Sequence, residues 1–493
     1  MRERESRCGG LKSRAACPSL AHFQMTKPIN TPRTRKVRRE VRGGKGGRGR
    51  ELQRSRRRVR RPDPRSIRVT TGDKSLTCAA GLAEFGSFVR ERGLDRELAT
   101  SFGHLKRTAQ VVYPMGAQLR LLLDLHVVGE GRPFGVEAMA HDELFVRLAG
   151  GCVPSVDVLY DDLARFGRDE LACLEALMAE QTLQRLRELR PKCIHVDIDT
   201  TVAVLFGQQE GALPGPNPRY HGRPSYHPIL ARVAEVDGIC GALLRPGDRG
   251  FGATDVPTIV RWLERLRKAV GPDCLVRVRV DAAGDCTELL AALDVLGVLY
   301  TVKARITRDM ADAIACTRSW QTVERDAFNE PSRQATTLNF VRAEWAARAG
   351  HTVRVVALRS RERDNGKQVF LWNDLDYTVQ AFLTNDWGAS EDDVARTYND
   401  RAGIEGLIAE LKGAWCIGKA PSAVFDANHA AFLLKLLAHN LFRSFVAERF
   451  APLARWRTSW ARRVTILRPG RLLRSGRRTT LRTTEVHLPR LQC

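Results

Sequence analysis

The sequence predicts an α/β protein in which a mixed α/β domain follows a helical region and basic tails flank both. Residues 193–199 and 274–281 alternate strictly between apolar and polar side chains, which is typical of β-strands. Residues 255–270 instead repeat their apolar side chains with the period of a helix. Strand and helix patterns that follow one another in this way favour a layered α/β fold.

The net charge of the chain, +24, is concentrated at its two ends. Residues 1–70 carry 23 Lys and Arg against 5 Asp and Glu, and residues 452–493 carry 11 against 1. Charge of this density indicates contacts with nucleic acid, made mainly through phosphates. We therefore expect a basic disordered arm over residues 1–70 and a basic C-terminal tail over residues 452–493.

Cysteine usage and hydropathy exclude two classes of protein. The twelve cysteines are scattered without Cys-x-x-Cys pairs or zinc-ligand spacing, which indicates a reducing compartment rather than a secreted scaffold. No signal peptide opens the chain, and no apolar run reaches the roughly 18 residues that a membrane span needs. We expect a cytoplasmic location and no membrane partner.

The region from 71 to 190 is expected to be helical. Leu82, Phe85, Phe88 and Val89 form one apolar stripe, and a long helix is predicted over about 168–189. A glycine pair at 150–151, followed by Ser155 at a helix start, is compatible with a DNA-reading helix-turn-helix or with a plain helical bundle. Both alternatives remain open, and we assign the region as a helical DNA-binding domain.

The next three stretches complete the expected architecture. Over 191–305, three strands are followed by a helix, a strand, a helix and a strand, which is the order of a ribonuclease H-like α/β domain. Residues 306–388 show only strand-like runs and are expected to be a β-rich insertion. Over 389–451 we expect the two C-terminal helices of the catalytic domain, at about 390–413 and 425–450.

Acidic side chains stand where these strands end. Asp197 and Asp199 share one face of the first strand, and Asp281 ends the second. Ligands of α/β sheets gather at the carboxyl ends of strands. Carboxylates brought together there repel one another and recruit divalent cations, so we expect Mg²⁺ or Mn²⁺, as two ions that assist phosphoryl transfer.

The helix predicted over about 390–413 supplies a third carboxylate. Tyr398, Arg401, Glu405 and Lys412 fall within roughly 60° of one another around its axis. Such a face is compatible with a solvated charged surface. Alternatively, Arg401 and Lys412 bind phosphates, or Arg401 pairs with Glu405 one turn away.

The spacing Tyr-x2-Arg-x3-Glu-x6-Lys resembles the signature of DDE insertion-sequence transposases that are marked by Tyr-Arg-Glu-Lys. Further motifs appear in the order seen in those proteins, most like the thirteen-eighty insertion-sequence family. The motifs are Asp197-Ile-Asp199-Thr-Thr201, Gly207-Gln-Gln, Gly222-Arg-Pro-Ser-Tyr226-His-Pro228, Leu244-Arg-Pro-Gly247 and Arg279-Val-Asp281. The resemblance spans roughly residues 80–480.

The resemblance implies that Asp199, Asp281 and Glu405 are the catalytic metal ligands, with Asp197 as the alternative to Asp199. It also implies that Tyr398 and Arg401 grip a DNA end. The expected activity is cut-and-paste transposition on terminal inverted repeats and target DNA, by a homodimer in a synaptic complex associated with the nucleoid.

Two other functions remain possible from the sequence. One is an inactive DNA-binding relic or repressor, and the other is a ribonuclease H-like nuclease without strand transfer. The first is suggested by departures from the family pattern, namely Ala282-Ala283-Gly284 after the second aspartate and Gly406 and Ala409 after the glutamate.

Overall fold

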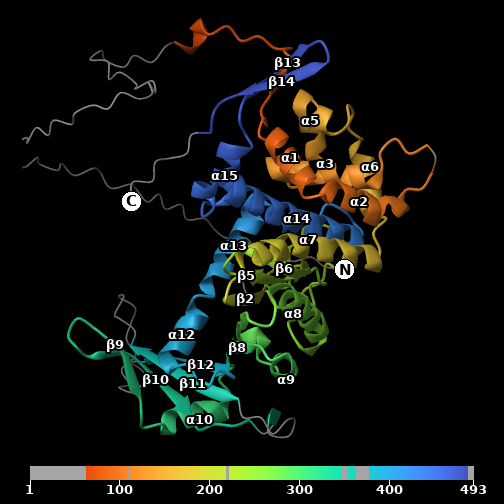
Figure 1. The fold of residues 1–493 in the computed structure, drawn as a ribbon. Helices are drawn as coiled ribbons and strands as arrows, with labels where there is room; N and C mark the ends of the chain where they lie inside the picture. Colours follow the sequence, from red (N-terminus) through yellow and green to blue (C-terminus); the bar gives the residue numbers. More distant parts are fainter. Residues whose placement is uncertain are drawn as a thin grey trace, which may run out of the picture. The chain divides into compact units, whose positions relative to one another are not determined.

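The structure is a computed structural model that describes residues 63–108, 110–217, 221–342, 344–345, 353–361 and 377–486. The contacts divide the chain into two units, Met1–Thr70 and Thr71–Cys493. Most of the arm expected over residues 1–70 lies outside the described residues. The second unit contains the sheet and the helices that position the site (Figure 1).

Helices form the part of the second unit that precedes the sheet. They are α1 (Leu82–Glu91), α2 (Leu94–Phe102), α3 (Met115–Val128), α4 (Gly135–Met139), α5 (Glu143–Leu148), α6 (Val156–Leu163) and α7 (Arg168–Leu189). α3 is apolar around most of its circumference, and it is buried except at Ala117 and Arg120. Ser155 caps α6 by accepting a hydrogen bond from the backbone amide of Val158.

The described strands include nine that form one mixed sheet in the order β6-β5-β2-β7-β8-β12-β11-β10-β9. In chain order they are β2 (Cys193–Thr200), β5 (Ile229–Val233), β6 (Gly238–Leu243), β7 (Leu275–Val280), β8 (Leu299–Lys303), β9 (Gln321–Arg325), β10 (Pro331–Leu338), β11 (Arg354–Arg361) and β12 (Tyr377–Thr384). β2, β7 and β8 run parallel, and the other neighbours are antiparallel. The expected α/β class is confirmed.

The parallel strands are joined by helices α8 (Val256–Val270) and α9 (Thr287–Val295). The alternation in β2 buries Ile194, Val196 and Ile198 in a shared core with the apolar residues of α8 and α9. Gly241 in β6 permits a close approach of α8, because a Cβ there would lie 2.2 Å from a ring atom of Trp262. A smaller hairpin, β3 (Ala203–Val204) with β4 (Ser225–Tyr226), follows β2.

The described strands of residues 306–388 belong to the main sheet. β12 pairs antiparallel with β8, which places Phe382 opposite Lys303, so β9–β12 extend the sheet that contains β2 and β7. The stretch also contains a helix that the strand-like pattern did not predict, α10 (Arg308–Cys316). One of the strand-like runs of this stretch, residues 368–372, lies outside the described residues.

The single helix expected over about 390–413 is two helices, α12 (Glu391–Asn399) and α13 (Ala402–Ala414). The amide of Arg401 donates to the carbonyl of Tyr398 at 2.9 Å, which closes a tight turn between them. Gly403 lies against the sheet there, since a Cβ on it would be 2.6 Å from Nη1 of Arg232. The break between α12 and α13 therefore lies where Gly403 meets the side chain of Arg232.

α14 (Phe425–Arg449) packs against α3, α7 and β6, as Figure 1 shows for its neighbour α7. Among the described residues it is the one helix long and apolar enough to cross a membrane, and 89% of its most apolar window is buried inside the protein. Its apolar surface therefore contributes to the core that joins the helical region to the sheet.

The described part of the expected C-terminal tail is folded. α15 (Thr458–Thr465) is followed by the hairpin β13 (Gly470–Ser475) and β14 (Arg478–Thr483). β13 also pairs with β1 (Leu76–Thr77), which makes a small three-stranded sheet beside the helical region. The high charge concealed the apolar residues that anchor this segment, such as Ile466 and Leu472, which are buried.

Candidate active site

Asp199 and Asp281 lie at the carboxyl ends of two adjacent parallel strands. β2 and β7 pair in a register that places Ile198 beside Val280, so the two aspartates occupy the next positions on neighbouring strands. One oxygen of Asp281 accepts the amide of Ala283 at 3.0 Å, and one oxygen of Asp199 accepts the amide of Thr200 at 2.8 Å. These local hydrogen bonds fix both carboxylates at the carboxyl ends of their strands.

Glu405 lies in the first turn of α13. Burial raises the pKa of Asp199 to about 6, Arg401 opposes that rise, and the negative charges of Asp281 and Glu405 add to it. The three residues predicted from the sequence to be catalytic therefore share one electrostatic environment.

Arg401 is the cation of this environment. It follows the turn between α12 and α13, is buried, and places Nη2 2.9 Å from Oδ2 of Asp199. The pairing of Arg401 with Glu405 that the helical spacing suggested is therefore wrong, because the long-range partner Asp199 takes the guanidinium. Its Nε is buried and has no hydrogen-bond acceptor among the described residues.

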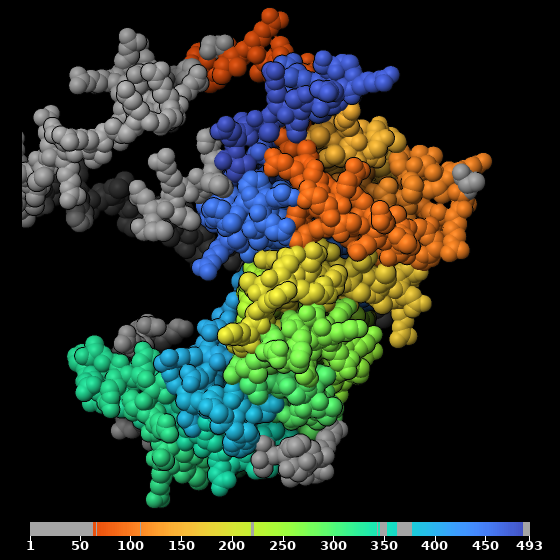
Figure 2. All heavy atoms as spheres, in the orientation of Figure 1, coloured from red at the N-terminus to blue at the C-terminus, as the bar shows by residue number. Residues whose placement is uncertain are grey.

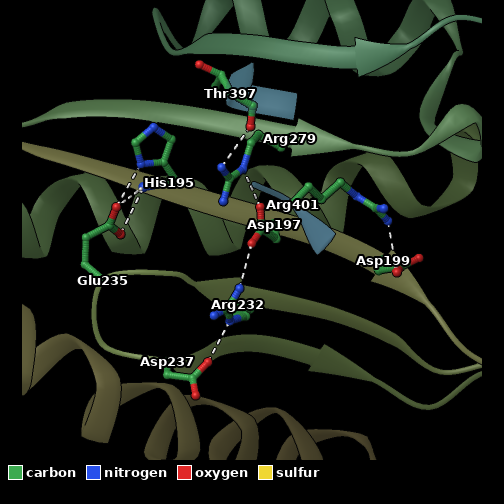
Figure 3. A network of polar contacts seen from close by, with 9 residues as sticks. All are labelled: His195, Asp197, Asp199, Arg232, Glu235, Asp237, Arg279, Thr397 and Arg401. Carbon is green, nitrogen blue, oxygen red and sulfur yellow. Dashed lines mark hydrogen bonds and ion pairs between the residues drawn. The ribbon is translucent and has the colours of Figure 1, made fainter. Parts of the chain in front are cut away.

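Asp197 belongs to a different network, which is shown in Figure 3. Its fully buried carboxylate accepts from Nε of Arg279 at 2.6 Å and from Nη1 of Arg232 at 3.0 Å. Arg279 also donates to the carbonyl of Thr397 at 2.9 Å. The network thus ties the last turn of α12, and with it Tyr398, to the centre of the sheet.

Arg232 and Arg279 are the residues that the sequence interpretation missed. Arg279 was visible in the Arg279-Val-Asp281 motif and on the polar face of its strand, but no role was given to it. In parallel strands the register decides the partner, and the register places Arg279 directly beside Asp197. Arg232 lies opposite Asp197 in the antiparallel neighbour, so pairing the strands first would have found both arginines.

Tyr398 and Lys412 flank the carboxylates. The Tyr398 ring packs against Phe382 with centroids 4.9 Å apart, and burial raises the pKa of its hydroxyl. Lys412, in the last turn of α13, donates from Nζ to the carbonyl of Val202 at 2.9 Å, shortly after the end of β2. These two of the three expected DNA-contacting residues lie near Asp199, and the third is Arg401.

The donor set suits a hard divalent cation, since all of its ligand atoms are carboxylate oxygens. In the conformation described, no group of three His, Cys, Asp or Glu residues among the described ones is close enough to hold a metal ion. Arg401 instead balances the charge of Asp199. The carboxylate oxygens suit the expected Mg²⁺ or Mn²⁺ by their chemistry, and the three residues would have to move closer together to hold an ion.

Two buried cations hold the carboxyl end of α13. Arg462 donates to the carbonyl of Ala414 at 2.9 Å, and Lys435 donates to the carbonyls of Cys416 and Lys419 at 3.0 and 2.8 Å. Burial lowers the pKa of Arg462 to about 10 and that of Lys435 to about 7. These bonds fix the end of the helix that carries Glu405.

Lys435→Met should change how stability depends on pH. Between pH 7 and 10.5 the unfolded lysine binds a proton that the folded one does not, so the free energy of unfolding of the wild type rises with pH in this window. Arg132 and Lys419 add to the lowering of this pKa, while Cys416 opposes it. Relative to the variant, the wild type should gain at most about 1.4 kcal/mol per pH unit.

Urea unfolding of both proteins across pH 7–10.5 measures this difference. Lys268→Met, which removes an exposed lysine on α8, serves as the control and should leave the pH profile of the wild type unchanged. Parallel profiles for wild type and Lys435→Met would contradict the lowered pKa.

The chain was compared with known families and structures. A family model described as Transposase DDE domain group 1 matches residues 60–490. No curated protein matches the chain. It is similar to the cryo-EM structure of a piggyBac transposase synaptic complex with hairpin DNA, at 12% identity and a TM-score of 0.41 over 78% of this chain and 79% of that chain.

Two further solved structures are similar to parts of the chain. One is the Drosophila P element transposase strand transfer complex, at 16% identity and a TM-score of 0.20 over 43% of each chain. The other is the Mos1 transposase paired-end complex with left transposon end, at 12% identity and a TM-score of 0.16 over 40% of this chain and 60% of that chain.

Proposed function

Because the chain belongs to the transposase DDE domain group 1 family, we propose that it is the transposase of an insertion sequence. It binds terminal inverted repeats and catalyses metal-dependent DNA cleavage and strand transfer by a cut-and-paste route. The observation that carries this proposal is the register that places Asp199 and Asp281 side by side at the carboxyl ends of β2 and β7. Glu405, in the first turn of α13, adds to the negative charge that acts on Asp199. We also assign it to the Tyr-Arg-Glu-Lys group, most like the thirteen-eighty family, with a ribonuclease H-like catalytic domain.

Asp199, Asp281 and Glu405 are the proposed metal ligands. Two Mg²⁺ or Mn²⁺ ions bound there would stabilise negative charge on the attacking and leaving oxygens of the displacement. Asp199 is favoured over Asp197 because Asp197 is fully buried and already accepts from two arginines. Asp199 has one arginine partner and lies at the strand end.

Arg401 has two tasks in this proposal. Without metal, its guanidinium balances the charge of Asp199. If Asp199 ligated a metal ion, the unsatisfied donors of the guanidinium would be available to a DNA phosphate, for which its planar fork is suited. In this proposal Arg401 therefore balances the negative charge of Asp199 without metal and that of a DNA phosphate with metal.

Tyr398 and Lys412 hold the DNA on either side of the cut. The raised pKa of Tyr398 keeps its hydroxyl protonated, so the hydroxyl can donate a hydrogen bond to phosphate. Lys412 adds a point charge beside Val202. The protein acts as a homodimer that synapses two ends, in the cytoplasm on the nucleoid.

The test uses end-labelled duplexes that carry the inverted repeats found beside the coding region. We expect Mg²⁺-dependent nicking at the repeat boundary, followed by joining of the freed 3′ end to a second DNA. Binding without cutting would support the inactive relic or repressor instead. Cutting without joining would support a nuclease without strand transfer.

A further inference from the structure

Residues 452–484 have an unusual composition for a folded segment. They contain ten arginines, no lysine and no acidic residue. The segment nevertheless forms α15 and the β13–β14 hairpin, at the outer surface beside the orange helices in Figure 2. Such a concentration of arginine needs a structural or a ligand-binding explanation, and the contacts separate the arginines into two sets.

Four of the arginines anchor the segment. Their partners lie on the helical region, on the strand and loop before it, or on α13: Arg462 with the carbonyl of Ala414, Arg468 with Glu84, Arg471 with Asp73 and Arg474 with Glu143. These contacts explain how a chain of this charge stays folded against the rest of the second unit. They leave six arginines that anchoring does not explain.

The other six are exposed, and no ion pair joins them to a carboxylate among the described residues. They are Arg455, Arg457 and Arg463 on and before α15, and Arg477, Arg478 and Arg482 on the hairpin. We call these six the arginine surface. Unpaired exposed arginines could simply be solvated, but two further observations indicate a ligand.

The first observation is the position of α15. Thr458 in its first turn hydrogen-bonds to Glu410 of α13, and Arg462 holds the carboxyl end of that helix. α15 is therefore fixed to the helix that carries Glu405. Its outer side presents Trp460, which is 55% exposed and has the Arg463 guanidinium 5.4 Å from its ring centroid. The ring supports Arg463 in an outward position.

The second observation is the pairing in the hairpin. Arg471 and Arg482 are directly opposite each other, and like charges in this position destabilise a hairpin unless an anion lies between them. Asp73 neutralises Arg471 but leaves Arg482. A two-stranded ribbon fits the major groove of B-form DNA, and arginine matches the geometry of phosphate.

We propose that the arginine surface binds the phosphate backbone of duplex DNA on the stretch that leads away from the cut at Glu405. The inference rests on the proposed function for the identity of the DNA, but its binding measurement does not require cutting. α15 lies next to the catalytic helix and the hairpin extends the contact along the duplex. The described part of the expected basic C-terminal tail is thus a folded segment fixed to the helix that carries Glu405.

The test measures the affinity of the full chain for a fluorescent DNA duplex at several KCl concentrations, with Ca²⁺ in place of Mg²⁺ to avoid cutting. Two double variants remove two charges each, Arg457→Gln/Arg463→Gln on α15 and Arg478→Gln/Arg482→Gln on the hairpin. Each should reduce the steepness of log Kd against log salt by about 1.8, since each lost phosphate contact removes about 0.9.

Arg267→Gln/Lys268→Gln on α8 is the matched control, because it removes two exposed cations from an element distant in the fold, and it should leave the slope unchanged. Thermal unfolding of the α15 variant and of the control should coincide with that of the wild type, since the substituted side chains are exposed. The hairpin variant should be at least as stable as the wild type, because it removes the like-charge pair of Arg482 with Arg471. An unchanged slope in both double variants, or a loss seen only with duplex RNA, would overturn the inference. If the double variants show a reduced slope but the wild type shows no Mg²⁺-dependent cutting, the proposed function is wrong and the inference about the arginine surface is still supported.

Discussion

Replacing Glu405 with glutamine should abolish metal-dependent DNA cutting and leave the fold intact. Glu405 is exposed in the first turn of α13, so the isosteric amide disturbs no core contact. The substitution removes one of three carboxylates that would hold the metal ions, whose charge stabilisation is worth several kcal/mol. We expect cutting to fall on the order of 10³-fold, measured on end-labelled inverted-repeat duplexes in Mg²⁺.

Asp199→Asn and Asp281→Asn should reduce cutting to a similar degree, since each removes a proposed ligand at the end of its strand. Asp400→Asn provides the matched control, because it neutralises an exposed acid in the turn just before α13. Its cutting rate should equal that of the wild type. If Glu405→Gln cuts as fast as this control, Glu405 is not a ligand.

Asp197→Asn should have the largest effect on stability of the substitutions considered. It leaves the buried Arg279 without its counter-charge, while Arg232 keeps Asp237, and breaking a buried ion pair in this way typically costs about 3–5 kcal/mol. The loss should appear as a lower midpoint in urea and thermal unfolding. Asp400→Asn should leave both midpoints unchanged.

The comparison of Asp197 with Glu405 separates a structural carboxylate from a catalytic one. The expected pattern is an unstable protein for Asp197→Asn and a stable but inactive protein for Glu405→Gln. If Asp197→Asn were as stable as the wild type and failed to cut DNA, then Asp197 would be the first metal ligand and Asp199 would be its support.

The strands and their aspartates were predictable because their pattern is local. Alternation over residues 193–199 and 274–281 identified β2 and β7, and the position of an aspartate at the end of each followed directly. The bounds of α7 agreed with its apolar period for the same reason. Where periodicity alone determines an element, the sequence was sufficient.

Features that depend on distant contacts were not predictable. The break between α12 and α13 lies where Gly403 approaches the side chain of Arg232. Arg401 forms its ion pair with Asp199, which is distant in the sequence, rather than with Glu405 on the next turn. The C-terminal tail was misjudged because charge is visible in the composition, whereas the partners of its anchoring arginines, such as Glu84 and Glu143, lie far upstream.

The pairing of β12 with β8 has a consequence for how this protein can evolve. It places β2 and β7 well inside the sheet, and it covers an edge of β8 that would otherwise be open. Deleting residues 306–388 would expose that edge to other copies of the chain and promote aggregation. It would also remove the apolar residues on which α12 packs. This stretch is therefore not a removable module, and lineages that shorten it should conserve enough of it to shield β8.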